Sequence, residues 1–143
     1  MKKIIAAFTF LFVSLSSAIA GEDDLIGIWI DDKQEAKTEF TKCEDGSYVG
    51  KLIWTVKDKG DKPLKDRKNP DRSLRDNPLV GTVVMKGITY DSAKKQWDMP
   101  WAYDPSWGMT GSGYIKLGEQ GQLVVKGSKW GITVTRELTR VNE

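Results

Sequence analysis

Hydrophobic and polar residues alternate along short stretches of the chain from Gly21 onward, with the period of two that is typical of β-strands. Each stretch ends in Gly, Asp, Asn or Pro, the residues that favour turns. No stretch carries the apolar stripe at a period of 3.6 that indicates an amphipathic helix. The pattern predicts eight strands, near residues 26–31, 36–43, 47–56, 80–90, 96–104, 109–117, 122–127 and 130–141.

In two of these strands the alternation gathers aromatic side chains on one face, which predicts that the face is buried. The aromatic residues so placed are Tyr48 and Trp54 in 47–56, and Trp97, Trp101 and Tyr103 in 96–104. Pro100 falls on the other face of its strand. Because proline cannot donate to a ladder, it marks an edge or a bulge.

Eight short strands with tight links predict a closed antiparallel barrel or a sandwich of two sheets. Closure is favoured because it leaves no edge strand to aggregate. We therefore expect an all-β fold, a single antiparallel eight-stranded barrel.

One connection is much longer than the turns. Residues 57–78 (KDKGDKPLKDRKNPDRSLRDNP) hold eight Lys or Arg and five Asp, and loops of this length in compact domains are usually functional. Each Asn-Pro pair restricts its Asn to extended geometry, and residues 73–76 have room for one helical turn between the pairs. We expect a structured flap. The flap residues expected to meet a partner are Arg67, Lys68, Arg72 and Arg75.

The first 20 residues have the pattern of a signal peptide. A basic start precedes an apolar run over residues 4–13, and Ala18 to Ala20 form the small-x-small pattern of a cleavage site. The run is too short to span a bilayer. We expect cleavage after Ala20, one domain over residues 21–143, and a periplasmic or secreted protein.

The amino-acid composition excludes several classes of catalytic and metal-binding site. The chain has no histidine and one cysteine, Cys43, which excludes Ser-His-Asp and Cys-His nucleophiles, His-ligated zinc and an intrachain disulfide. Lys and Arg number 22 against 20 Asp and Glu, and Lys2 and Lys3 of the leader account for the excess. The domain thus lacks the basic charge of a nucleic-acid-binding protein. We expect no metal, no cofactor and no nucleic acid.

The first and last strands carry complementary residues. Even positions of the last strand place Arg136 and Arg140 on its apolar face, and a guanidinium can stack on an indole while donating to carbonyls. In a closed barrel these two strands are neighbours. We expect Trp29 to plug one end of the barrel with Arg140 across it, and Gly27 to allow close approach. Arg136 is the second candidate, and the alternative is that Arg140 turns out to water.

Several of these sequence motifs resemble those of two known groups of proteins. The Gly-x-Trp start with a terminal-strand Arg resembles the lipocalins and the wider calycin group. The second resemblance rests on "GIWIDD", "DGSYVGKLIW", "NPDRSLRDNPLVGTVVMKG", "QWDMPWAYDPSWG" and the final "LTRV". These segments are similar to the exported bacterial family known as domain of unknown function 2147, over nearly all of the mature chain. The resemblance implies a lipocalin-like barrel and export, and it implies no activity.

Three functions remain open, and we favour a non-enzymatic barrel that binds a small apolar or amphipathic ligand. Eight strands can just enclose one small ligand. The expected lining of the cavity is Tyr48, Trp54, Trp97, Trp101 and Tyr103, with Asp104 orienting a polar group of the ligand. The alternative for these aromatic residues is that they simply fill the barrel.

The second candidate is a cell-envelope interaction or structural protein whose flap meets an anionic envelope component. The third is an enzyme, which without histidine would need paired carboxylates, as in glycoside hydrolysis. Asp98 and Asp104 fall on the polar face of their strand, which disfavours such a pair. A membrane-spanning barrel is not expected, because Arg136 and Arg140 would then face lipid.

Overall fold

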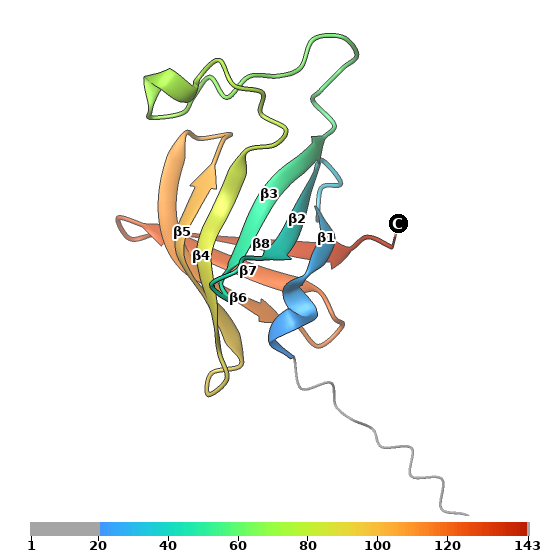
Figure 1. Ribbon diagram of the computed structural model, residues 1–143, viewed down its shortest axis with the longest axis vertical. Coiled ribbons are helices and arrows are strands. Elements are labelled where there is room, and N and C mark those ends of the chain that lie inside the picture. The colour runs from blue at the N-terminus through green and yellow to red at the C-terminus, as the bar shows by residue number, and fades with distance from the viewer. Residues whose placement is uncertain (1–20, 143) are drawn as a thin grey trace, which may run out of the picture.

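Eight strands, joined in sequence order, close into an antiparallel barrel (Figure 1). They are β1 (Gly27–Asp31), β2 (Ala36–Lys42), β3 (Tyr48–Thr55), β4 (Val83–Asp91), β5 (Gln96–Asp104), β6 (Met109–Leu117), β7 (Leu123–Lys129) and β8 (Ile132–Arg140). Each strand pairs with the next, and β8 pairs with β1. The computed structural model describes residues 21–142, so the expected leader lies outside the described residues. The predicted all-β, eight-stranded barrel is confirmed.

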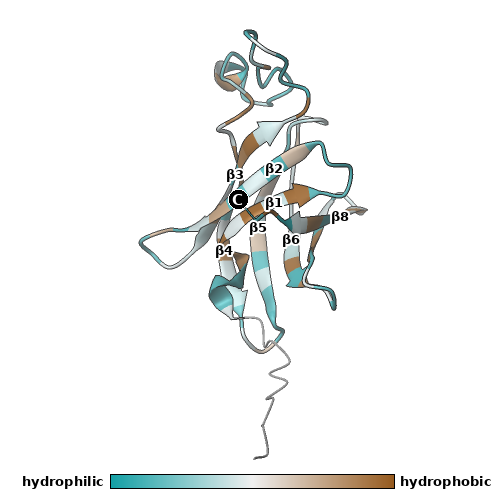
Figure 2. Cartoon of the chain, turned by 90° about the vertical axis from the view of Figure 1, so that its right-hand side faces the viewer, coloured by the Kyte–Doolittle hydropathy of each residue, from teal (hydrophilic) through white to brown (hydrophobic). Residues whose placement is uncertain are grey.

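The two ends of the barrel are covered by different kinds of segment (Figure 1). A single 3-10 turn, η1 (Glu22–Leu25), lies across one end, and the flap, residues 57–78, rises from the other. The flap is mainly hydrophilic, whereas hydrophobic segments recur along the strands (Figure 2). The end covered by η1 holds the main hydrophobic core.

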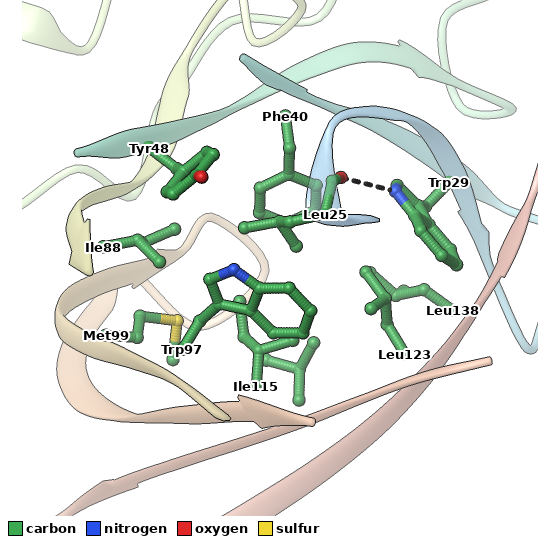
Figure 3. Close-up of a cluster of buried hydrophobic side chains, with 11 residues drawn as sticks. Leu25, Trp29, Phe40, Tyr48, Ile88, Trp97, Met99, Ile115, Leu123 and Leu138 are labelled. Atoms are coloured by element: carbon green, nitrogen blue, oxygen red, sulfur yellow. Dashed lines mark hydrogen bonds between the residues drawn. The ribbon is translucent and has the colours of Figure 1, made fainter. Parts of the chain in front are cut away.

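Aromatic residues fill this core and fasten η1 to it (Figure 3). The buried indoles of Trp29 and Trp97 each donate a 2.9 Å hydrogen bond to η1, to the carbonyl oxygens of Leu25 and Glu22 respectively. Burying an indole is favourable when its N–H finds such a partner. The remaining buried members of the core are Phe40, Tyr48, Ile88, Met99, Ile115, Leu123, Val125 and Leu138.

The plug, which consists of Gly27, Trp29 and Arg140, joins the first strand to the last. Trp29 is the cross-strand partner of Arg140, and the guanidinium carbon lies 4.3 Å from the centroid of the indole. Arg140 also donates to the carbonyl oxygens of Ile26, at 2.9 Å, and Asp24. A Cβ at Gly27, whose φ is +136°, would lie 2.6 Å from Arg140 Nη1, so a side chain there would displace the guanidinium.

Arg140→Ala is expected to lower the free energy of unfolding by about 1–2 kcal/mol, because it removes the cation from the indole and two donors from carbonyl oxygens. Arg140→Lys keeps the charge but lacks the planar fork of donors, so it should recover little of the loss. Urea denaturation followed by circular dichroism measures both variants. Full stability in Arg140→Ala would mean that the stacked arginine is energetically neutral.

A bulge divides the aromatic face predicted for β5 into two. β5 has one extra residue relative to β6 between Met99 and Ala102, and both of these residues pack against the main core. Trp101 and Tyr103 belong to a second, smaller cluster. The prediction of one continuous aromatic face is therefore wrong, because a bulge reverses the alternation after it.

A second register shift moves Trp54 away from the interior. Opposite the step from Lys37 to Thr38, β3 carries one extra residue, so Trp54 pairs with Lys37 and lies on the opposite face from Leu52. Trp54 is 38% exposed, and the Lys37 ammonium lies 5.3 Å from the centroid of its ring. The prediction that Trp54 lines an interior cavity is wrong.

Candidate functional site

Hydrogen bonds within the flap hold it in a defined conformation. Its two arms are joined where Asp66 N donates to Asn77 O at 3.0 Å. Between them lies one helical turn, η2 (Arg72–Leu74), close to the position expected from the Asn-Pro pairs. Arg75 Nε donates to Asn69 O at 2.7 Å. The flap is thus a structured element and contributes a fixed wall to whatever lies beneath it.

The flap is attached to the barrel at the end of β5 and the β5–β6 turn. Lys68 Nζ donates to Ser106 O at 2.8 Å, and Tyr103 Oη donates to the carboxylate of Asp66. A Cβ at Gly108 would lie 2.2 Å from Lys68 O, and Gly108 has a φ of +62°. Glycine at this position therefore allows the flap backbone to approach the turn directly.

A cleft of about 750 Å³ lies between the flap and the barrel wall. Its barrel side consists of Val83 and Lys86 of β4, Trp101 and Tyr103 of β5, and Thr110 of β6. Its flap side includes Asp66, Asn69, Asp71, Leu74 and Asn77, and the segment leading into β4 adds Val80 and Thr82. The volume is in the range of small-molecule sites, roughly 300–1,000 Å³. We call this site the flap cleft.

Asp66 is a buried carboxylate in the wall of the flap cleft. It is 3% exposed, and its two oxygens accept from Tyr103 Oη and, at 2.8 Å, from Asn69 Nδ2. Burial of Tyr103 and its bond to this carboxylate raise the pKa of the phenol well above its usual range. Tyr103 therefore stays protonated near neutral pH and keeps donating to Asp66.

Two stacked rings and one cation form the barrel side of the flap cleft. The rings of Trp101 and Tyr103 lie 6.3 Å apart, centroid to centroid, at 25° to one another. The Lys86 ammonium lies 4.4 Å from the centroid of the Trp101 ring, a cation–π geometry. The site thus offers an apolar surface with a positive charge over the Trp101 ring.

The structure does not bring the predicted ligand-binding residues together. Trp101 and Tyr103 line the flap cleft. Tyr48 and Trp97 are buried in the main core, which corresponds to the alternative that they fill the barrel. The prediction that these two residues line a cavity is therefore wrong, since their side chains occupy the interior.

Asp104 is engaged outside the cleft lining. Its carboxylate accepts from Ser106 N at 2.9 Å and lies 3.9 Å from Arg136 Nη2. Arg136, the second candidate for the stacked arginine, thus faces Asp104 and not Trp29. Asp104 stabilises the β5–β6 turn, to which the flap is attached.

The four basic flap residues divide into two pairs. Lys68 and Arg75 bond to backbone carbonyl oxygens of Ser106 and Asn69, so they hold the flap in place. Arg67 and Arg72 are exposed. Lys68 is exposed as well, so three of the four residues present a charge on the flap surface, as the interaction hypothesis requires.

Tyr103→Phe is expected to loosen the flap, because it leaves the buried Asp66 carboxylate with one donor fewer, at a cost of about 1–3 kcal/mol. The flap holds eight Lys or Arg, so trypsin measures its opening directly. We expect faster cleavage within residues 57–78 in the variant than in the wild type. Equal cleavage rates would mean that this bond does not hold the flap.

The same contact predicts a dependence on alkaline pH. The pKa of Tyr103 is higher in the folded protein than in the unfolded protein, where it is about 10. Its contribution to stability is therefore fully present below pH 10 and is lost as the pH rises through the pKa of the folded protein. The free energy of unfolding of the wild type should therefore approach that of Tyr103→Phe only above about pH 10. Urea midpoints measured from pH 7 upward check this, and such an approach near neutral pH would contradict it.

Residues 27–140 match the family described as "uncharacterized protein conserved in bacteria (DUF2147)". Among solved structures, the chain is similar to protein HP1028 from the human pathogen Helicobacter pylori, described as belonging to the lipocalin family. The two are 24% identical, with a TM-score of 0.68 over 83% of this chain and 84% of that one. No curated protein gave a significant match.

This likeness shows that the barrel has the lipocalin architecture, in agreement with the fold expected from the plug residues. Within residues 21–142, neither helical turn has the length and hydrophobicity needed to cross a bilayer.

Proposed function

The chain belongs to the bacterial family DUF2147, and from that premise we propose that it is a non-enzymatic, exported protein that binds a small amphipathic ligand in the flap cleft. The ligand would lie between the flap and the outer end of β5, and not inside the barrel. The observation that carries the proposal is a cleft of about 750 Å³ with an aromatic pair, Trp101 and Tyr103, in its wall.

The packing of the barrel supports this choice of site. At the end covered by η1, side chains from all parts of the sheet form one buried core, and protein interiors of this kind are close-packed. The flap cleft, in contrast, has an apolar wall that includes Trp101, Leu74 and Val80. Sites for small molecules combine such a wall with a few polar groups that fix orientation.

The polar groups of the flap cleft indicate what kind of molecule would fit. An apolar body would pack against Trp101, and an anionic or strongly polar group would reach the Lys86 ammonium, which lies over the Trp101 ring. Asp66 is less available, since both of its oxygens already accept hydrogen bonds. A carboxylate engaged in this way is better suited to holding the flap than to proton transfer, which favours binding over catalysis.

Export is the second part of the proposal. It rests on the sequence pattern of residues 1–20, a basic start, an apolar run and a small-x-small site. N-terminal sequencing of the protein from the periplasmic or secreted fraction of its host should begin at Gly21. Recovery of the uncleaved chain from the cytoplasm would contradict export and leave the binding proposal untouched.

Binding is tested with one variant in the flap cleft and one matched control outside it. The probe is 8-anilinonaphthalene-1-sulfonate, which has a flat naphthalene ring and one anionic group. Trp101→Ala should weaken its binding by about tenfold or more, because it removes most of the stacking surface. Trp54→Ala, which removes another tryptophan with a lysine over its ring, should leave binding unchanged.

Native mass spectrometry of protein purified gently from its host then addresses the natural ligand. We expect a small molecule to remain bound to the wild type and to be absent or depleted in Trp101→Ala. If the wild type binds neither the probe nor any host molecule, or if both variants bind as the wild type does, the flap cleft is not a binding site.

A further inference from the structure

The β7–β8 turn contains a tryptophan where a small residue is expected. Lys129 and Ile132 form the last pair of this hairpin, and the two residues between them, Trp130 and Gly131, have φ of +51° and +79°. Positive φ at both central positions defines a type I′ turn, in which Asn-Gly is the preferred sequence. A bulky side chain at the first position is strained there.

Packing does not compensate for this strain. The side chain of Trp130 is 86% exposed, and the turn projects away from the barrel (Figure 1). A strained residue that makes no contribution to the core indicates a role in contact with another molecule.

Further apolar residues are exposed near this turn. Trp107, in the β5–β6 turn, is 71% exposed, and Ile132 and Val134 of β8 are 60% and 44% exposed. Ile132 and Val134 are two residues apart on one strand, so they share a face. We call these four residues, Trp107, Trp130, Ile132 and Val134, the tryptophan rim.

A lysine lies beside each of the two tryptophan turns. The Lys129 ammonium lies 4.8 Å from the centroid of the Trp130 ring and also contacts Thr110 Oγ1 at 3.3 Å, close to the start of β6. Lys68 of the flap bonds to Ser106 O, the carbonyl next to Trp107. Each exposed indole is therefore accompanied by a positive charge at the same edge of the molecule.

From this pairing we propose that the tryptophan rim docks on the surface of an anionic phospholipid bilayer. Tryptophan has an apolar body with a polar N–H and prefers the headgroup level of a membrane. Lysines beside it gain from the negative potential of anionic lipids. The two indoles and Ile132 would enter the interface, while Lys68 and Lys129 meet the phosphate groups. The barrel itself would stay outside the hydrocarbon region.

This surface is separate from the flap cleft in its chemistry and in its test. The cleft binds through Trp101, which is not part of the tryptophan rim. Loss of binding to one would leave the other intact, and each proposal can fail alone.

The experiment is vesicle flotation with vesicles of phosphatidylcholine alone and of phosphatidylcholine mixed with phosphatidylglycerol. We expect the wild type to float only with the anionic vesicles, less so as salt is raised, and with a blue shift of tryptophan emission. Trp130→Asn creates the preferred Asn-Gly turn, so it should fold at least as stably as the wild type. It should nevertheless bind anionic vesicles about tenfold more weakly, because it withdraws a large aromatic surface.

Two further variants complete the design. Trp107→Ser should also weaken binding, whereas Trp54→Thr, on the barrel wall, should not. The proposal is overturned if the wild type does not bind anionic vesicles at low ionic strength. It is also overturned if the double variant Trp107→Ser/Trp130→Asn binds as tightly as the wild type, since the basic flap alone would then explain the attraction. Binding only to another protein, with no affinity for vesicles, would equally contradict it.

Discussion

Replacing Trp29 by alanine is expected to lower the free energy of unfolding by about 3–5 kcal/mol, the loss typical of deleting a large buried aromatic side chain. Trp29 is 1% exposed and lies between η1 and the strands of the main core (Figure 3). The change would remove its packing, its hydrogen bond to Leu25 O, and the ring on which Arg140 stacks. Urea unfolding followed by circular dichroism measures the loss.

Two controls separate burial from the cation–π contact. Trp107→Ala removes an exposed indole and should change stability by no more than about 0.5 kcal/mol. A double-mutant cycle between Trp29→Ala and Arg140→Ala should give a coupling of about 0.5–2 kcal/mol. Additive losses in the cycle would show that the stacked pair contributes nothing beyond its separate parts.

Gly113→Ala is expected to destabilise the barrel by about 3 kcal/mol or more, at the upper end of the cost of overpacking. A Cβ at Gly113 would lie 1.7 Å from Lys126 O and 2.7 Å from Lys126 C. Both atoms belong to the backbone of β7, so the clash can be relieved only by moving β6 and β7 apart. Thermal unfolding measures the effect as a lower midpoint.

The cross-strand partner of Gly113 provides the matched control. Gly127 faces Gly113 in the register of β6 and β7, but a Cβ there would meet no atom closer than 4.0 Å. The free energy of unfolding of Gly127→Ala should therefore lie within about 0.5 kcal/mol of that of the wild type. If both substitutions had the same effect, β-propensity and not the close approach of backbones would explain the loss.

Alternation along the chain predicts the order and approximate bounds of the strands because the barrel is built from sequential hairpins. The strand predicted over 96–104 corresponds to β5, Gln96–Asp104, and that over 109–117 to β6, Met109–Leu117. The juxtaposition of Trp29 and Arg140 follows from closure, since closure makes the first and last strands neighbours. Both predictions depend only on local period and chain order.

Bulges and long-range contacts set the limits of this reasoning. One extra residue in β3 and one in β5 place Trp54 and Trp101 on the opposite faces from those predicted. Local patterns in the sequence do not distinguish a bulged strand from a regular one. The exception is Pro100, which indicates an edge or a bulge in β5. The flap cleft was missed because it depends on Asp66 meeting Tyr103, which lies 37 residues further along the chain. In the sequence, Asp66 is one of five acidic residues in a polar loop and carries no signal of burial.

The most direct test of the flap cleft uses the indole N–H signals of ¹⁵N-labelled protein. The chain has six tryptophans, and single Trp→Phe variants assign their signals. On titration with 8-anilinonaphthalene-1-sulfonate, or with the molecule retained from the host, we predict that the Trp101 signal shifts while those of the buried Trp29 and Trp97 do not. Shifts of Trp29 and Trp97 with Trp101 unchanged would place the ligand inside the barrel and contradict the account.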